Sequence, residues 1–411
     1  MVAEKILKRV ETLLGKINRL SDKKIGVILP NGKRLMEDAE VFVEVREWDV
    51  LCDILKDPEL GFARAYMDEK IEVLGDLEDV LVAGNRFVRK LEDQNRSWYR
   101  KLRDCLFYFF SSLFVKNRLD KEKRDVEYHY NLGNDFYSLW LDESLTYSCA
   151  FFEDPSWSIE KAQREKRKII YEKLQLKAGE TLLDIGCGWG SIIIESAKEL
   201  GVYSTGITLS GEQYKYVLEK IKEKNLEGRV EVYLLHYMEL PKLKKEFDKV
   251  VSVGMFEHVG KRNIRKFFEV VSSVMKNNAL FLLHTIGKEH EGNTSKFMTT
   301  YIFPGGYLPS ISEIIENTRG LNLSLLDVDD WRMHYYYTLK KWRERFSKYV
   351  DRIRDKYGNR FVRMWDFYLT TSMSAFKVGN THLFQVLFSK GVKNDYPIIR
   401  RRLIPLVQSV H

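Results

Sequence analysis

The sequence Thr-Leu-Leu-Asp-Ile-Gly-Cys-Gly-Trp-Gly, residues 181–190, decides the fold of this 411-residue chain. Residues 181–185 form a short apolar run of β character, three glycines follow, and residues 191–200 have the apolar spacing of a helix. Glycine permits the backbone angles of a tight turn and lets a ligand lie against bare main chain at a helix N-terminus. The stretch therefore predicts a strand, a turn and a helix start that bind a nucleotide-like ligand.

Strand and helix patterns alternate around this stretch. Alternation at this interval is typical of βαβ units, so we predict an α/β Rossmann-like fold whose parallel sheet is covered on both faces. In such sheets ligands bind beyond the carboxyl ends of the strands, and these ends converge on one crevice. The predicted strands are residues 202–207, 230–235, 250–253 and 280–283, and the predicted helices are residues 159–174, capped by Ser158, 211–224 and 264–275.

A smaller α+β domain is predicted ahead of the sheet, over residues 1–95. Residues 2–20 have helical spacing, and a turn at residues 30–33 separates two β-like segments. This part carries no recognisable catalytic constellation. The two β-like segments are residues 25–29 and 39–45, and helical patterns follow at residues 48–55, 62–67 and 77–88.

The remaining boundaries follow from composition. Residues 96–124 mix basic and aromatic side chains and are predicted to be a linker, so the catalytic domain is expected over residues 125–411. Within it, residues 288–335 contain several Gly and Pro and are expected to be irregular. A connection of that length predicts a lid or a substrate wall. Two long helical patterns, residues 335–357 and 361–376, and a last strand, residues 384–388, follow.

Charge narrows the class of partner. Lys and Arg number 67 against 59 Asp and Glu, which gives a net charge of +8 and a pI near 9.0. This balance favours an anionic partner: nucleic acid, anionic lipid or a phosphorylated substrate. The linker suits an anionic lipid surface and equally a solvated helix packed on its neighbour, so the sequence leaves both interpretations open.

Cysteine usage and apolar runs indicate the compartment. The four cysteines form no C-x-x-C pair, so neither a metal site nor a disulfide framework is predicted and a reducing cytoplasm fits best. The first 20 residues lack the apolar core of a signal peptide, and the longest apolar run, residues 106–115, is too short to span a bilayer. We expect a cytoplasmic protein that is at most peripherally associated with the inner face of the membrane.

The glycine turn resembles a known motif. Asp184 precedes G-x-G-x-G, and the resulting D-x-G-x-G-x-G resembles the first motif of S-adenosylmethionine (SAM)-dependent methyltransferases. The alternative is a purely structural turn, because short glycine motifs recur in unrelated folds.

Six stretches, in the same order, resemble the bacterial cyclopropane fatty acid synthases. They read YNLGND (130–135), YSCA (147–150), LDIGCGWG (183–190), VGMFEHVG (253–260), LHTIG (283–287) and YIFPGG (301–306). Members of this family add a methylene from SAM to the cis double bond of an acyl chain in a membrane phospholipid. The resemblance, which runs from about residue 125 to the end, thus implies an unsaturated phospholipid substrate, contact with the membrane surface and a homodimer.

The resemblance also assigns the cofactor residues. One departure concerns the third strand of the motif region, after which the family usually has Asp before Tyr, whereas His236 precedes Tyr237 here. This difference indicates either an altered contact with adenine or a surface histidine. The residues assigned to SAM are Tyr147, Ser148, Asp184, Gly186, Gly188, Gly190, Thr208 and Gln213.

The chemistry of this family explains the residue types. An isolated alkene is a poor nucleophile, so the enzyme must hold it in line with the SAM methyl group and exclude water. Transfer leaves a carbocation, which aromatic faces stabilise without attacking it. Because 13% of the residues are aromatic, we expect an aromatic-rich cavity.

A base must then remove a proton from the added methyl group so that the ring closes. The resemblance implies a bound bicarbonate ion, to which His284 and Tyr335 would donate hydrogen bonds, while Glu257 would accept one or orient His284. Each residue also has a structural interpretation as a buried thiol, histidine, tyrosine or strand residue. The predicted catalytic set is Cys149, Glu257, His284, Ile286 and Tyr335.

Three other functions are alternatives to this one. A fatty-acyl C-methyltransferase would quench the cation differently and give a methyl-branched product. A basic RNA methyltransferase would need a nucleic-acid-binding module, and the sequence has no recognisable one. A lipid-binding protein without activity would not need the glycine turn. The expected function is cyclopropanation, with no nucleic-acid partner.

Overall fold

The computed structural model describes residues 2–94, 132–292 and 294–397; the predicted linker, residues 96–124, lies outside them. A four-stranded sheet in the order β2-β1-β3-β4 forms the N-terminal part. Its strands are β1 (Ile25–Ile28), β2 (Arg34–Leu35), β3 (Val41–Val45) and β4 (Ile71–Leu74), and its helices are α1 (Val2–Asn18), α2 (Trp48–Lys56), α3 (Pro58–Met67) and α4 (Leu77–Gln94).

Alternation decides which face of this small sheet is buried. Val41, Val43 and Val45 of β3 are buried while the residues between them are partly exposed, as the period of a strand requires. Sequence reasoning predicted β1 and β3 but not the short strands β2 and β4, whose two and four residues carry little periodic signal.

A seven-stranded sheet in the order β10-β11-β9-β8-β5-β6-β7 forms the larger part. Strands β5 to β9 are parallel, as predicted, but β11 runs antiparallel to both β9 and β10. The strands are β5 (Thr181–Ile185), β6 (Tyr203–Thr208), β7 (Val230–Leu234), β8 (Phe247–Val253), β9 (Met275–Gly287), β10 (Leu323–Asp330) and β11 (His382–Lys390).

The prediction that residues 288–335 are irregular is wrong in part. They contain a π-helical turn, η4 (Met298–Ile302), the short helix α12 (Ile311–Glu316) and all of β10. Strand β10 is an edge strand whose residues are all partly or fully exposed, so the hydrophobic alternation that reveals a strand is weak.

Helices cover both faces of the large sheet. Leu183 and Ile185 of β5 pack on the side of α11 (Ile264–Val274), whereas Leu182 packs on the side of α8 (Ile159–Leu174) and α9 (Ser191–Leu200). Helix α10 (Gly211–Glu223) lies against β6 and β7. Residues 181–185 are therefore nearly continuously buried, as expected for a central parallel strand.

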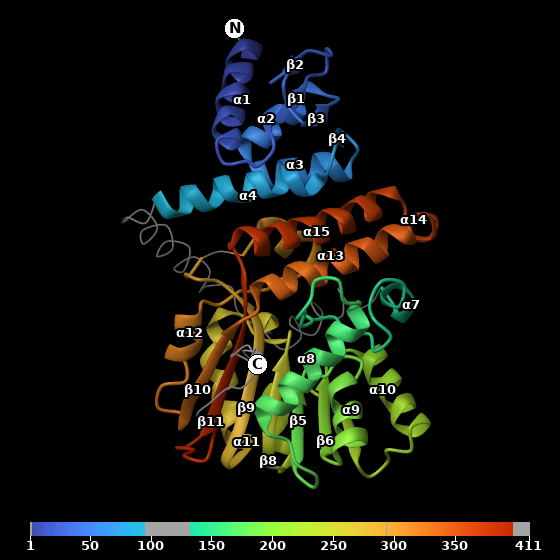
Figure 1. Ribbon diagram of the computed structural model, residues 1–411, viewed down its shortest axis with the longest axis vertical. Coiled ribbons are helices and arrows are strands. Elements are labelled where there is room, and N and C mark those ends of the chain that lie inside the picture. Colours follow the sequence, from blue (N-terminus) through green and yellow to red (C-terminus); the bar gives the residue numbers. More distant parts are fainter. Residues whose placement is uncertain (1, 95–131, 293, 398–411) are drawn as a thin grey trace, which may run out of the picture.

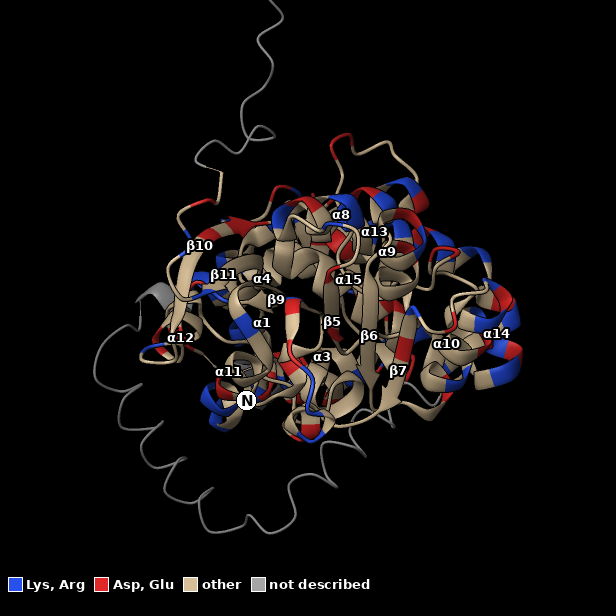
Figure 2. Cartoon of the chain, turned by 90° about the horizontal axis from the view of Figure 1, so that it is seen from below, with Lys and Arg blue, Asp and Glu red and all other residues tan. Residues whose placement is uncertain are grey.

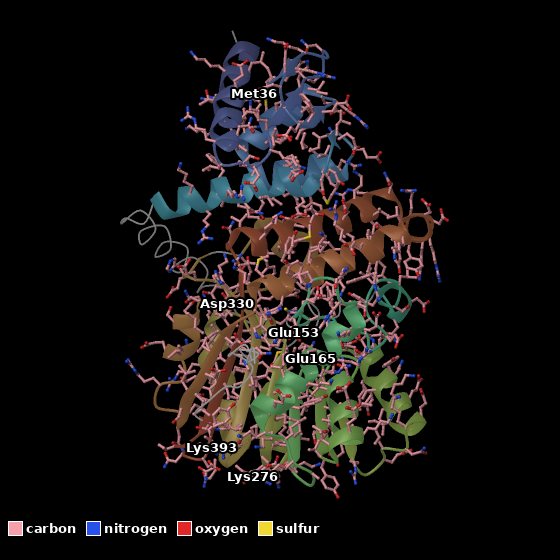
Figure 3. The ribbon with its side chains drawn as sticks, viewed as in Figure 1. Met36, Glu153, Glu165, Lys276, Asp330 and Lys393 are labelled. Atoms are coloured by element: carbon pink, nitrogen blue, oxygen red, sulfur yellow. The ribbon has the colours of Figure 1, made fainter. Side chains whose placement is uncertain are left out.

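A layer of long helices separates the two sheets (Figure 1). Helices α13 (Arg332–Lys348), α14 (Val350–Tyr357) and α15 (Asn359–Val378) lie above the large sheet, and α3 and α4 pack on α15. In Figure 3, Asp330, which ends β10, lies on the side of this layer, and Lys276, near the start of β9, lies at the opposite edge. The carboxyl ends of the parallel strands therefore face the helical layer.

Polar contacts join the N-terminal part to this layer. The Arg343 guanidinium bridges Asp366 (2.8 Å) and Asp76 (3.1 Å), and the Tyr66 hydroxyl donates to Asp366 (3.0 Å). Both signs of charge are interspersed on outer helices such as α10 and α14 (Figure 2). Within the described residues, no helix is both long and apolar enough to cross a membrane.

Candidate active site

A cavity of about 120 Å³ opens at the carboxyl ends of β5, β6 and β8. Its position agrees with the crevice predicted from the strand ends. Seven of the eight residues assigned to SAM line it, namely Tyr147, Ser148, Asp184, Gly186, Gly188, Thr208 and Gln213.

The glycine turn forms the floor of the cavity because its backbone excludes side chains. Gly186 has φ +87°, and a Cβ atom there would lie 2.6 Å from the Met255 side chain. Gly190 does not line the cavity. It caps α9 with φ +82°, and a Cβ atom there would lie 2.9 Å from Val217, so this glycine serves the packing of the helix.

The loop that carries Tyr147 and Ser148 is held by helix α8. The Gln163 amide nitrogen donates to the Ser148 carbonyl oxygen (2.9 Å), and the Lys166 ammonium donates to the Ser148 hydroxyl oxygen (2.9 Å). Gln163 and Lys166 are fully buried, and Lys166 also lines the cavity.

Sequence reasoning missed both Gln163 and Lys166. Lys161, on the same helix, is by contrast exposed, and its ammonium lies 3.7 Å from the centre of the Trp157 ring. Gln163 and Lys166 are three residues apart and hence on one helical face. A polar pair on the buried face of α8 was the signal that could have revealed them.

Burial strongly shifts the pKa of one acidic group and one basic group of the cavity. Burial raises the pKa of Asp184 to about 7, and it lowers the pKa of Lys166 to about 7. One oxygen of Asp184, Oδ1, is buried and has no hydrogen-bond partner among the described residues. A ligand that donates a hydrogen bond would satisfy it.

His236 lines the same cavity, so the interpretation as a surface histidine is wrong. Its side chain is 1% exposed, and its Nδ1 accepts a hydrogen bond from the Met238 N–H (3.2 Å). His258, which sequence reasoning did not single out, also lines the cavity, and burial lowers its pKa to about 4.

Glu257 lies in a 3₁₀ turn after β8, η2 (Phe256–His258), and His284 and Ile286 lie in the last part of β9, all three outside the set of cavity-lining residues. One Glu257 oxygen accepts from the Ile286 N–H (2.6 Å), and the other, Oε2, is buried with no partner among the described residues. Burial raises the pKa of the Glu257 carboxyl. The carboxyl is thus fixed on one side and available on the other.

His284 is completely buried in β9. Its Nδ1 faces the Gln385 amide nitrogen (3.1 Å), which can only donate, so the hydrogen of the neutral ring is on Nε2. Nε2 is buried and has no partner among the described residues. Burial lowers the pKa of His284 well below its ordinary value, so the ring is neutral at physiological pH.

Cys149 and Tyr335 belong to the apolar cluster against which Ile286 packs. Burial raises the pKa of the Cys149 thiol, so it stays protonated, and its Sγ donates to the Ala150 carbonyl oxygen (3.2 Å). The Tyr335 ring packs on Phe376, with 4.6 Å between ring centres. The structure therefore buries four of the five predicted catalytic residues, and the fifth, Ile286, is partly buried against the cluster that holds Cys149 and Tyr335.

The expected aromatic surroundings are present beside the cavity. Tyr147 packs on Trp140 and Trp342, with ring centres 5.3 and 5.2 Å apart, and its hydroxyl is 2.6 Å from that of Tyr368 on α15. These rings connect the cavity wall to the helical layer.

Comparison with known proteins shows the family to which this chain belongs. The family described as mycolic acid cyclopropane synthetase matches residues 117–386. The chain is 36% identical over 366 residues to the cyclopropane-fatty-acyl-phospholipid synthase of Escherichia coli (strain K12), covering 87% of this chain and 90% of that protein. It is 32% identical over 360 residues to a probable fatty acid methyltransferase of Pseudomonas putida, covering 85% and 87%.

A solved structure agrees with these relatives. Mycolic acid cyclopropane synthase CmaA1, complexed with S-adenosylhomocysteine (SAH) and CTAB, has a TM-score of 0.62 and 29% identity, covering 67% of this chain and 99% of that one. The chain therefore belongs to the mycolic acid cyclopropane synthetase family and is a SAM-dependent cyclopropane synthase-type methyltransferase.

Proposed function

We propose that this enzyme transfers the SAM methyl group to a cis double bond in the acyl chain of a membrane phospholipid and closes a cyclopropane ring after a bound bicarbonate ion accepts a proton. In the balance of this reaction, the bond between sulfur and methyl breaks and SAH leaves. The methyl carbon forms two bonds to the former alkene carbons and loses one proton to the base.

The buried polar atoms of Glu257 and His284 carry this proposal. Bicarbonate has a hydroxyl that donates and oxygens that accept, and the two side chains offer one acceptor, Glu257 Oε2, and one donor, His284 Nε2–H, both without partners among the described residues. Leaving such atoms buried and unpaired is unfavourable, so a small ligand with both functions fits the site. When bound, the anion would supply the base for ring closure.

The protonation states of His284 and Cys149 and the nearby aromatic rings indicate the roles of these groups. A neutral His284 orients the anion without protonating it, because its pKa is well below the usual range. A protonated Cys149 thiol is a poor nucleophile, so it would not trap a carbocation. The rings of Tyr147, Trp140 and Trp342 would stabilise positive charge beside the cavity.

The phospholipid substrate and peripheral membrane contact rest on the E. coli relative and on the surface of the N-terminal part. Among its described residues, that part exposes four large apolar side chains, Met36 (38%), Trp48 (42%), Leu74 (46%) and Val88 (46%), and Met36 lies at the end of the molecule far from the large sheet (Figure 3). Together with the net charge of +8, these side chains suit docking on an anionic lipid surface.

A fatty-acyl C-methyltransferase is the second candidate, which the P. putida relative favours by its name. It would share the cavity and the methyl transfer but not the ring closure. Glu257 Oε2 and His284 Nε2, both buried and without partners among the described residues, favour the cyclopropane product.

The test is a defined reaction. The protein is incubated with SAM, vesicles of monounsaturated phospholipid and bicarbonate, and the acyl chains are analysed by mass spectrometry and proton NMR. The proposal expects a gain of one CH₂ with cyclopropane ring signals and a rate that falls when bicarbonate is removed. A methyl-branched chain would favour the second candidate, and ring formation independent of bicarbonate would refute the proposed base.

A further inference from the structure

Lys166 is a buried lysine that forms no ion pair with any of the described residues. Its side chain is completely buried on α8, yet it lines the cavity and reaches the Ser148 hydroxyl oxygen at 2.9 Å. No carboxylate oxygen of the described residues lies within 4.0 Å of its ammonium nitrogen, the distance of a salt bridge. A buried ammonium in this position is unfavourable unless an anion compensates it.

The charges that face Lys166 do not remove this need. Arg167 repels the ammonium, whereas Asp142 and Asp184 attract it from beyond ion-pair distance, and the nearby groups Cys149 and His284 are neutral. The cavity is the open side. An anionic group placed there would favour the charged form of the lysine.

The hydrogen bond from Lys166 leaves the Ser148 hydroxyl free to donate its hydrogen to another group. A hydroxyl has one hydrogen to donate, and Ser148 Oγ already accepts from Lys166. Its O–H is therefore directed at an acceptor, and both Ser148 and Lys166 line the cavity. An anion beside Ser148 would receive the O–H and lie close to the ammonium.

Asp184 supplies the complementary acceptor. It is 2% exposed, lines the same cavity, and its Oδ1 has no partner among the described residues. The cavity thus offers donors, at Ser148 and Lys166, and a carboxylate oxygen that has no partner among the described residues. This set matches a zwitterion, in which a carboxylate and an ammonium are attached to the same carbon.

We propose that Lys166 is a positioning residue for SAM: it holds the Ser148 hydroxyl toward the methionyl carboxylate, while Asp184 accepts from the methionyl ammonium. By fixing this end of SAM, Lys166 sets the direction of the S-methyl group. The inference rests on SAM binding alone and is independent of the phospholipid and the bicarbonate.

The experiment compares two ligands by isothermal titration calorimetry. SAH has the amino-acid group, whereas 5′-methylthioadenosine keeps the adenosine and the sulfur but lacks that group. In Lys166→Met, the affinity for SAH should fall roughly ten- to a hundredfold, as expected for a lost hydrogen bond to a charged group. The affinity for methylthioadenosine should stay within about twofold, on the same scale.

Two further variants make the result specific. Lys168→Met, two residues away on α8 with its side chain 60% exposed, is the matched control and should change neither affinity. Ser148→Ala should reduce SAH affinity alone, and adding Lys166→Met to it should have little further effect, because both changes break the same contact. This second pair keeps the test valid where the buried methionine impairs folding.

Equal weakening of both ligands in Lys166→Met would overturn the proposal, since it would assign the lysine to the fold of the cavity. Unchanged SAH affinity would overturn it as well. A wild-type protein that binds neither ligand would instead contradict SAM binding itself, so the two failures are distinguishable.

Discussion

The cavity at the glycine turn and the polar group at Glu257 and His284 are built in opposite ways. The cavity floor comes from one contiguous stretch, in which bare backbone at Gly186 and Gly188 makes room for a large ligand. The polar group is assembled from the turn after β8 and from β9 and is already packed, and only single atoms have no partner among the described residues. Local backbone geometry makes the cavity suitable for binding a ligand. Burial of polar atoms makes the group at Glu257 and His284 suitable for chemistry.

Glu257→Ala separates the two regions most sharply. If Glu257 orients the base, ring formation should fall at least about a hundredfold, the usual scale of general-base catalysis, while the SAH affinity should stay unchanged. Turnover is measured by acyl-chain mass spectrometry and binding by calorimetry. Glu291→Ala, whose side chain is 61% exposed, is the control. Full turnover in Glu257→Ala would show that the assigned anion site is wrong.

Gly186→Ala tests the cavity region, and here we expect SAH binding itself to weaken. A side chain at φ +87° strains the backbone, and its Cβ would meet Met255 at 2.6 Å, so we expect about 2–3 kcal/mol of destabilisation together with weakened SAH binding. Gly179→Ala has a similar φ of +84° but open space around it. This control should cost about 1–2 kcal/mol in denaturant titrations and leave SAH binding intact. Equal effects of the two substitutions would contradict a close-packed cavity floor.

The pH dependence of stability probes the burial of His284. Its folded pKa is well below its ordinary value, so only the unfolded chain takes up the proton as the pH falls below about 6.5. The free energy of unfolding is therefore unaffected by this histidine above that pH and falls by about 1.4 kcal/mol per pH unit below it. Urea titrations at pH 7.5 and 5.5 should show a larger loss for the wild type than for His284→Gln. Identical losses would mean that His284 titrates normally.

Salt should affect neither buried region but should weaken the approach of the enzyme to its substrate. With a net charge of +8, the initial rate on anionic vesicles should fall several-fold between low and about 0.5 M salt, where charges are screened within a few ångströms. The SAH affinity should change little over the same range. A rate that is independent of salt would remove the electrostatic part of the docking proposal.

The correspondence between sequence and structure follows the same division. The strand, turn and helix at residues 181–200, the parallel core and seven cavity residues were predictable, because each depends on a pattern local in the chain. Strand β10 was not, since an exposed edge strand carries little alternation. His236 was left open, because a polar residue after a strand can face solvent or a cavity with the same sequence pattern.

The α/β fold, the glycine turn and the family can be predicted from the amino-acid sequence, because hydrophobic period and backbone freedom are properties of short stretches. The burial of Lys166 against Ser148 becomes visible only in the folded molecule, as does the one buried atom of Glu257 and of His284 that has no partner among the described residues. Those facts depend on which groups from distant segments meet and which are shut off from water. Burial and partnership, which set the pKa values and the free hydrogen-bonding atoms, are properties of the packed molecule.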